Sequence, residues 1–162
     1  MALAVVLALN VGTDPTAATR TSSLLGKPAP AFDLPTLDGG RVTLAGLAGK
    51  SVVVNFWNTW CIPCRQELPA LKEFYRTHAN DSDFVMIGIV RDDTTPEVRR
   101  YVRQEKIGWV VALDPGSKAA LDFGTRGQPE TFVLAPDGQM VGFQWGPSTV
   151  AGLEAMLATA RG

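Results

Sequence analysis

The feature that most constrains this chain is a pair of cysteines placed shortly after an unbroken apolar segment. Residues 51–57 read Ser-Val-Val-Val-Asn-Phe-Trp, and such a run of β-branched and aromatic residues predicts a strand that is buried on both faces. Cys61 and Cys64 follow it. Pro63, between them, suits the first turn of a helix, where its missing N–H costs nothing. The segment therefore predicts a central strand that leads into a helix with a Cys-x-x-Cys motif at its start.

The cysteine pair admits four chemical interpretations. A zinc site needs about four ligands, and the chain offers only these two cysteines and one histidine, His78. Covalent haem attachment needs a histidine directly after the second cysteine, and Arg65 stands there instead. A structural disulfide across so short a loop would contribute only about 2 kcal/mol. A redox-active dithiol, the fourth interpretation, is therefore favoured.

The predicted helix start has a chemical consequence for the first cysteine. Free backbone N–H groups and the positive end of the helix dipole both stabilise a thiolate at this place. Because the thiolate is the attacking species, a lowered pKa would make Cys61 reactive near neutral pH. Cys64 lies one turn further along, so we expect it to be more shielded and to resolve the mixed disulfide.

The rest of the pattern predicts an α/β domain. The turn signature Asp38-Gly39-Gly40 joins two short strands at 32–34 and 41–44. Strand–helix–strand order followed by a hairpin and a helix predicts a mixed sheet with helices on both faces. We expect further strands at 84–90, 109–113, 130–134 and 139–145, helices at 97–106 and 118–123, and a last helix capped by Ser148.

Composition and charge narrow the possible classes of protein. Of the 162 residues, 46% are hydrophobic and 19% charged, which excludes a disordered chain. The formal net charge of −1 gives no basic surplus for binding nucleic acid. We therefore expect one folded domain and no nucleic-acid partner.

Residues 2–9 form an apolar run that is far shorter than the roughly 20 residues of a membrane span. The run has the length of a signal-peptide core, although no basic residue precedes it. We expect residues 1–23 to be the remnant of an export signal or anchor followed by a flexible tether, and residues 24–162 to be the folded domain. A flexible tail of a soluble protein is the alternative.

Three segments carry a resemblance to a known family. The segment from Val54 to Cys64 resembles the active-site segment of the thioredoxin superfamily, and its continuation Arg65-Gln66-Glu67-Leu68-Pro69 resembles the extracytoplasmic TlpA/ResA/CcmG (DsbE-like) branch. Residues 26–32 and 127–133 also resemble that branch. The resemblance covers about residues 26–157. It implies a thioredoxin-like α/β fold: a central mixed β-sheet flanked by helices, with an N-terminal β-hairpin and a central βα insertion.

The resemblance also implies a function and a location. Members of this branch are exported or membrane-anchored, and many reduce the cysteines of apocytochrome c before haem is attached, whereas others oxidise or isomerise exported proteins. We therefore expect an extracytoplasmic thiol–disulfide oxidoreductase that is secreted, periplasmic or tethered to the outer face of the cytoplasmic membrane. Its substrates would be protein thiols or disulfides, with apocytochrome c among them, and a membrane thiol donor or oxidant would serve as redox partner. We expect a monomer with no metal and no cofactor beyond the Cys61–Cys64 disulfide. A reductant in cytochrome c maturation is favoured over a Dsb-type oxidant or isomerase, although the direction of electron flow stays open.

The same resemblance assigns roles to residues around the pair. The proline that matches Pro129 is cis in family members and packs against the active-site disulfide, so that the backbone of Gln128 would pair with an extended substrate. Glu67 matches an acidic residue near the thiols, where a partly buried carboxylate with a raised pKa would serve proton transfer at Cys64. A surface glutamate favoured by the helix dipole is the alternative. We expect these residues to contact the substrate: Trp60, Ile62, Pro63, Gln128 and Pro129.

Two other functions compete with thiol–disulfide exchange. A peroxiredoxin shares the opening pattern of residues 26–32, but its Pro-x-x-x-Thr/Ser-x-x-Cys motif would require proline at position 54 and threonine or serine at position 58. Val54 and Asn58 stand there. A binding module with a dormant disulfide is the other rival, and it predicts that Cys61→Ser leaves partner turnover unchanged. The sequence assigns no role to Asp92 and Asp93, which we expect in a loop. We expect His78 on the surface. Arg65 is a candidate partner of the Cys61 thiolate, although a solvated arginine is favoured.

Overall fold

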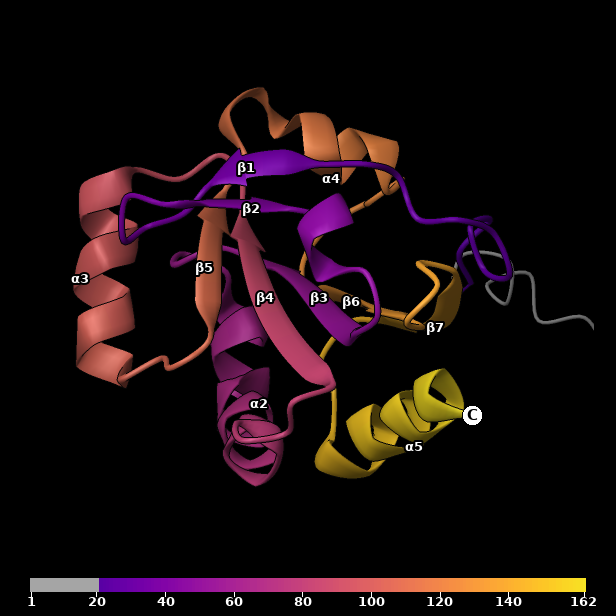
Figure 1. Ribbon diagram of the computed structural model, residues 1–162. Coiled ribbons are helices and arrows are strands. Elements are labelled where there is room, and N and C mark those ends of the chain that lie inside the picture. Colours follow the sequence, from indigo (N-terminus) through magenta and orange to yellow (C-terminus); the bar gives the residue numbers. More distant parts are fainter. Residues whose placement is uncertain (1–20) are drawn as a thin grey trace, which may run out of the picture.

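Five strands form the central sheet of the computed structural model, which describes residues 21–162. Strand β3 lies in the middle, parallel to β4 on one side and antiparallel to β6 on the other. The sheet is therefore mixed, as predicted (Figure 1). From edge to edge the order is β5 (Val110–Leu113), β4 (Phe84–Val90), β3 (Ser51–Trp57), β6 (Glu130–Leu134) and β7 (Met140–Trp145).

Helices α2 (Ile62–His78) and α5 (Val150–Arg161) cover one face of this sheet (Figure 1). Their apolar stripes meet alternate residues of the strands, because successive side chains of a strand point to opposite faces. Phe74 and Leu153 are fully buried in this layer. Its core also contains Val53, Leu68, Leu71, Met86, Trp109, Val133 and Leu157.

The opposite face is covered by an N-terminal hairpin and a short helix, α4 (Lys118–Asp122). Strands β1 (Asp33–Pro35) and β2 (Arg41–Thr43) pair antiparallel and form the predicted hairpin. The one-turn helices η2 (Ala45–Leu47) and η3 (Pro115–Ser117) complete the connections. Four phenylalanines fill this second core layer: Phe32, Phe56, Phe123 and Phe132.

Helix α3 (Thr95–Glu105) and strand β5 form the predicted central βα insertion, which lies between β4 and α4 in the chain. Strand β5 pairs parallel to β4 and extends the sheet on that side. Val98 of α3 packs in a third apolar cluster that contains Trp57 and both cysteines. The insertion therefore supports the cysteine motif from the side.

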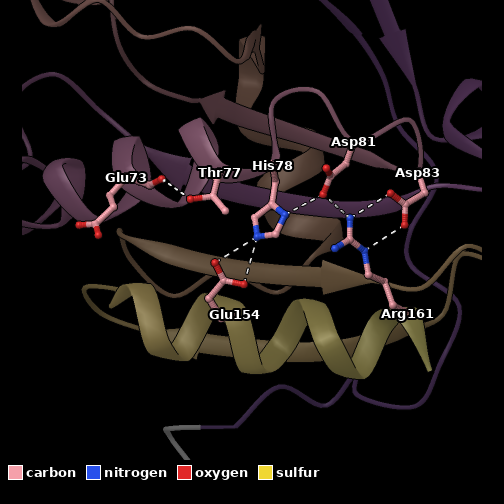
Figure 2. A network of polar contacts seen from close by, with 7 residues as sticks. All are labelled: Glu73, Thr77, His78, Asp81, Asp83, Glu154 and Arg161. Carbon is pink, nitrogen blue, oxygen red and sulfur yellow. Dashed lines mark hydrogen bonds and ion pairs between the residues drawn. The ribbon is translucent and has the colours of Figure 1, made fainter.

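Two local predictions are wrong. The cap of α5 is Thr149, whose hydroxyl accepts the Gly152 N–H at 3.1 Å, and not Ser148. His78, which we expected on the surface, is buried between α2 and α5 and contacts Asp81 and Glu154 (Figure 2). In both cases a residue distant in the sequence takes part, because the Ser148 hydroxyl contacts Thr131 and His78 contacts Glu154.

The prediction of an export signal or anchor lies outside the described residues over positions 1–20. Thr21 and Ser22 contact the domain: the Arg126 guanidinium donates to the Thr21 carbonyl at 3.0 Å, and Ser22 Oγ lies 3.8 Å from Met140 Sδ. None of the helices within residues 21–162 combines the length and the apolar character that a membrane span needs.

Candidate active site

Cys61 and Cys64 form a disulfide at the N-terminus of helix α2. Cys61 is the N-cap residue, and its Sγ accepts the backbone N–H of Cys64 at 3.2 Å. A negative charge on Cys61 would therefore meet an N–H donor and the positive end of the helix dipole. We expected Cys64 to be the more shielded of the two, but in the disulfide form both are buried, at 4% and 6% exposure.

A cis proline faces the disulfide, as predicted. The Gln128–Pro129 peptide bond is cis, and the Gln128 carbonyl oxygen lies 3.6 Å from Cys61 Sγ. This contact is one reason why Cys61 is covered. The backbone of Gln128 is thus placed directly beside the sulfur that the sequence predicts to be the nucleophile.

A groove of about 490 Å³ opens beside the cis proline. Its lining includes Pro63 from helix α2, Trp145, which is 48% exposed, and the Arg126–Pro129 segment. Trp60 and Ile62, on either side of Cys61 in the chain, are exposed at 55% and 70%. Exposed large apolar side chains that lie together in a patch are typical of a binding site. The complete lining of the groove is Pro63, Arg126, Gly127, Gln128, Pro129, Trp145, Gly146 and Pro147.

Glu67 lies one turn beyond Cys64 and is buried under the sheet, at 1% exposure. The Asn55 amide donates to its Oε1 at 2.8 Å, and the Ser148 N–H donates to its Oε2 at 2.8 Å. Burial raises the pKa of Glu67 to about 7, although these hydrogen bonds favour the charged form and oppose the shift. The Ser148 hydroxyl lies 3.1 Å from Thr131 Oγ1 and does not cap helix α5.

Glu67 and Cys64 line the same small internal cavity, of about 10 Å³. Trp57 and Tyr101 close it from the side of β3 and α3. A cavity of this size has about the room of one water molecule. The structure therefore places a carboxyl group with a pKa near neutrality at the inner cysteine.

Sequence reasoning missed two residues that hold the turn before Cys61. Asp93 accepts the Thr59 N–H at 2.8 Å. Arg65, which we considered as a partner of the Cys61 thiolate, instead donates from Nε to the Thr59 carbonyl at 2.8 Å and lies over the Tyr101 ring. No sequence signal marks the Asp93 contact, because the two residues are 34 positions apart.

Residues 21–162 bring together no three His, Cys, Asp or Glu side chains that could hold a metal ion. The redox group that the structure contains is the Cys61–Cys64 disulfide. A mixed sheet whose central strand leads to a disulfide at a helix start, opposite a cis proline, defines a thioredoxin-fold thiol–disulfide oxidoreductase.

Comparison with known proteins gives the family. Residues 25–142 match the model of the AhpC/TSA family, and the chain belongs to this family. It is 35% identical over 133 residues to the thiol-disulfide oxidoreductase ResA of Bacillus thuringiensis (strain Al Hakam), covering 82% of this chain and 76% of ResA. It is 37% identical over 141 residues to the thiol:disulfide interchange protein DsbE of Allochromatium vinosum, covering 85% of this chain and 75% of DsbE. A crystal structure of a thioredoxin-family thiol:disulfide interchange protein from Chlorobium tepidum TLS superposes with a TM-score of 0.73 at 33% identity, over 83% of this chain and 96% of that one.

Proposed function

We propose that this protein is an extracytoplasmic reductant of protein disulfides that uses Cys61 as nucleophile and Cys64 as resolving thiol. The observation that carries the proposal is the position of Cys61 at the cap of α2, with the Cys64 N–H at 3.2 Å and the Gln128 carbonyl at 3.6 Å. The first contact stabilises a thiolate, and the second marks the backbone beside which an extended substrate would lie.

The exchange proceeds in two balanced steps. The Cys61 thiolate attacks one sulfur of a substrate disulfide, so that a Cys61–substrate disulfide forms and the other substrate sulfur leaves as a thiolate. Cys64 then loses its proton and attacks the Cys61 sulfur, which releases the second substrate thiolate and forms the Cys61–Cys64 disulfide. The substrate gains two electrons and the protein loses two. A thiol donor, proposed to be a membrane protein, restores the dithiol.

Glu67 is proposed to take the proton of Cys64 in the second step. Its carboxyl group has a pKa of about 7 and shares a small cavity with Cys64. A base is most effective when its pKa lies near the working pH. The alternative of a surface glutamate does not agree with its 1% exposure.

Substrate proteins are proposed to bind across the open surface around Cys61. Their extended segment would pair with the backbone of Gln128, as in strand addition. Apolar side chains of the substrate, next to its reactive cysteine, would contact the exposed Trp60 and Ile62 and the groove beside Pro129. The residues proposed for these contacts are Trp60, Ile62, Pro63, Gln128 and Pro129.

We propose apocytochrome c as one substrate and a location outside the cytoplasm, because the resemblance to the TlpA/ResA/CcmG branch implies both. We also propose that the protein acts as a monomer and needs no cofactor besides its disulfide. A fusion of the full chain to a reporter enzyme that is active only outside the cytoplasm tests the location, and an inactive fusion would contradict it.

Trapping tests the function. Cys64→Ser cannot resolve the mixed disulfide, so it should accumulate covalent complexes with its substrates, whereas Cys61→Ser should accumulate none. Trapped apocytochrome c supports the proposed role. A mixed population of secreted proteins would instead indicate the Dsb-type oxidant or isomerase. The exchange function itself would be refuted if Cys64→Ser trapped nothing and its Cys61 titrated like free cysteine.

A further inference from the structure

The loop between β4 and α3 runs along the turn that precedes Cys61. Three consecutive residues of that turn donate hydrogen bonds to three consecutive residues of the loop. The Thr59 N–H donates to Asp93 Oδ2 at 2.8 Å, and the Trp60 indole donates to the Asp92 carbonyl at 3.3 Å. The third contact joins the Asn58 amide to the Arg91 carbonyl.

The shape of the loop depends on two aspartates that play different parts. Asp92 has a positive φ of 52°, a conformation that aspartate tolerates better than most residues, and it contributes its carbonyl group. Asp93 contributes its side chain: Oδ2 accepts the Thr59 N–H, and Oδ1 accepts the Thr94 N–H at 2.8 Å. Its carboxylate therefore joins the start of α3 to the turn before Cys61.

The turn in question sets the position of Cys61. The Cys61 N–H donates to the Asn58 carbonyl at 3.3 Å, and Cys61 then has the extended backbone of an N-cap residue. In that geometry its sulfur accepts the Cys64 N–H at 3.2 Å. The same loop also reaches the second half of the site, since Arg91 Nη2 lies 3.5 Å from Gln128 Oε1.

We infer that Asp93 is a positioning residue that lowers the pKa of the Cys61 thiol by holding the Asn58–Trp60 turn. The inference rests on the proposed function, in which Cys61 is the nucleophile. Asp93 acts through geometry and against its own charge, because a carboxylate near Cys61 by itself disfavours a thiolate. When Asp93 is replaced, the loss of its hydrogen bonds should therefore raise the pKa of Cys61, whereas the loss of its charge should lower it.

A matched pair of substitutions separates the two effects. Asp93→Asn and Asp92→Asn each remove one negative charge from the same loop. Asparagine at 92 keeps a residue that tolerates positive φ and leaves the Asp92 carbonyl in place. Asparagine at 93 keeps only one acceptor oxygen, so that Thr59 or Thr94 loses its partner. Each variant is made in the full chain with the Cys64→Ser background, which leaves Cys61 as the only thiol.

The readout is the pKa of Cys61, taken from the pH dependence of its alkylation by iodoacetamide, with thermal unfolding to confirm the fold. Asp93→Asn should raise this pKa by about half a unit or more relative to Asp92→Asn, so that alkylation below the pKa is about threefold slower or more. Equal pKa values in the two variants would overturn the inference, even if Asp93→Asn melts at a lower temperature. If Cys61 already has an ordinary cysteine pKa in the Cys64→Ser protein with both aspartates present, the proposed function fails instead. The two failures are therefore distinguishable.

Discussion

A carboxyl group buried as deeply as Glu67 is retained only where its surroundings compensate for the lost water. The Asn55 amide and the Ser148 N–H do so in part, and burial still raises the pKa to about 7. Near neutral pH the group thus exchanges a proton readily. At pH values below about 7 it holds the proton, and above that value it is ionised, as its proposed role as a base for Cys64 requires.

Glu67→Gln should therefore remove a pH-dependent step. When the reduced protein with Glu67 is mixed with a peptide disulfide, the rate of product release should increase as the pH rises through about 7. The variant should lose this inflexion and react about tenfold to a hundredfold more slowly at pH 7. Stopped-flow tryptophan fluorescence between pH 5.5 and 8.5 measures it. Glu73→Gln, on the same helix but exposed, is the control, and an inflexion that survives in Glu67→Gln contradicts the role.

Single residues also show where prediction from sequence stops. The pair Cys61–Cys64 and the cis bond at Pro129 follow from motifs that are contiguous in the chain, so both could be predicted. The contacts of Asp93 with Thr59 and of Ser148 with Glu67 join residues 34 and 81 positions apart. No local pattern encodes such pairs, because each partner alone is typical of a loop or a helix cap.

At the scale of elements, a polar network joins the end of α2 to α5 and to the loop before β4 (Figure 2). His78 lies between Asp81 Oδ2 at 2.8 Å and the Glu154 carboxylate at 3.0 Å. Partial burial lowers the pKa of His78, but the hydrogen bonds to Asp81 and Glu154 outweigh it, and the net pKa is raised. Arg161 pairs with Asp81 and Asp83 and closes the network.

The network should make stability depend on pH. The folded pKa of His78 lies above its ordinary value of 6.5. The stability that the fold gains from protonated His78 is therefore fully present below about pH 6.5 and is lost as the pH rises through the folded pKa. Glu154→Gln should lower the free energy of unfolding by about 0.5–1 kcal/mol at pH 5.5, since Glu154 is 42% exposed, and by much less at pH 8.5. Urea unfolding at both pH values measures this. Glu73→Gln should show no such difference, and an equal loss at both pH values would refute the explanation.

Within the sheet, Gly88 allows two indole rings to lie against β4. A Cβ at this position would lie 2.6 Å from Trp57 Nε1 and 3.0 Å from Trp109 Nε1. Gly88→Ala should therefore destabilise the fold by about 1–3 kcal/mol, because two packed rings must move. Gly127→Ala, whose Cβ would meet no atom within 4 Å, should change the free energy of unfolding little. Equal stability of Gly88→Ala and the parent in urea would show that the rings can yield.

The elements themselves were largely predictable. Strands β3, β4 and β6 have the predicted bounds, because a continuous apolar run ends where burial ends. Helix starts were less predictable: α3 begins at Thr95 with Thr94 as its cap, two residues before the predicted start. Several serines and threonines are suitable caps in any such loop, and tertiary contacts choose among them.

At the scale of the whole molecule, the redox state is linked to folding. Any difference in stability between the disulfide and dithiol forms appears as a difference in reduction potential between the folded and unfolded chains. An oxidant stabilises its reduced form, whereas a reductant does not. The direction of electron flow, which the sequence leaves open, can therefore be read from the stability of the two forms.

The proposed reductant should be more stable when oxidised. The disulfide closes a loop with a sequence separation of 3, and loop closure alone would contribute about 2 kcal/mol. The thiolate of Cys61 offsets part of this in the dithiol form, because the Cys64 N–H and the helix dipole stabilise it. The oxidised protein should thus melt about 3–8 °C above the reduced protein at pH 7. Calorimetry with and without a dithiol measures the difference, and Cys64→Ser, which forms no disulfide, should melt at one temperature in both buffers. A reduced form that melts above the oxidised one would mean that folding favours the dithiol, and electrons would then flow from substrate thiols to this protein.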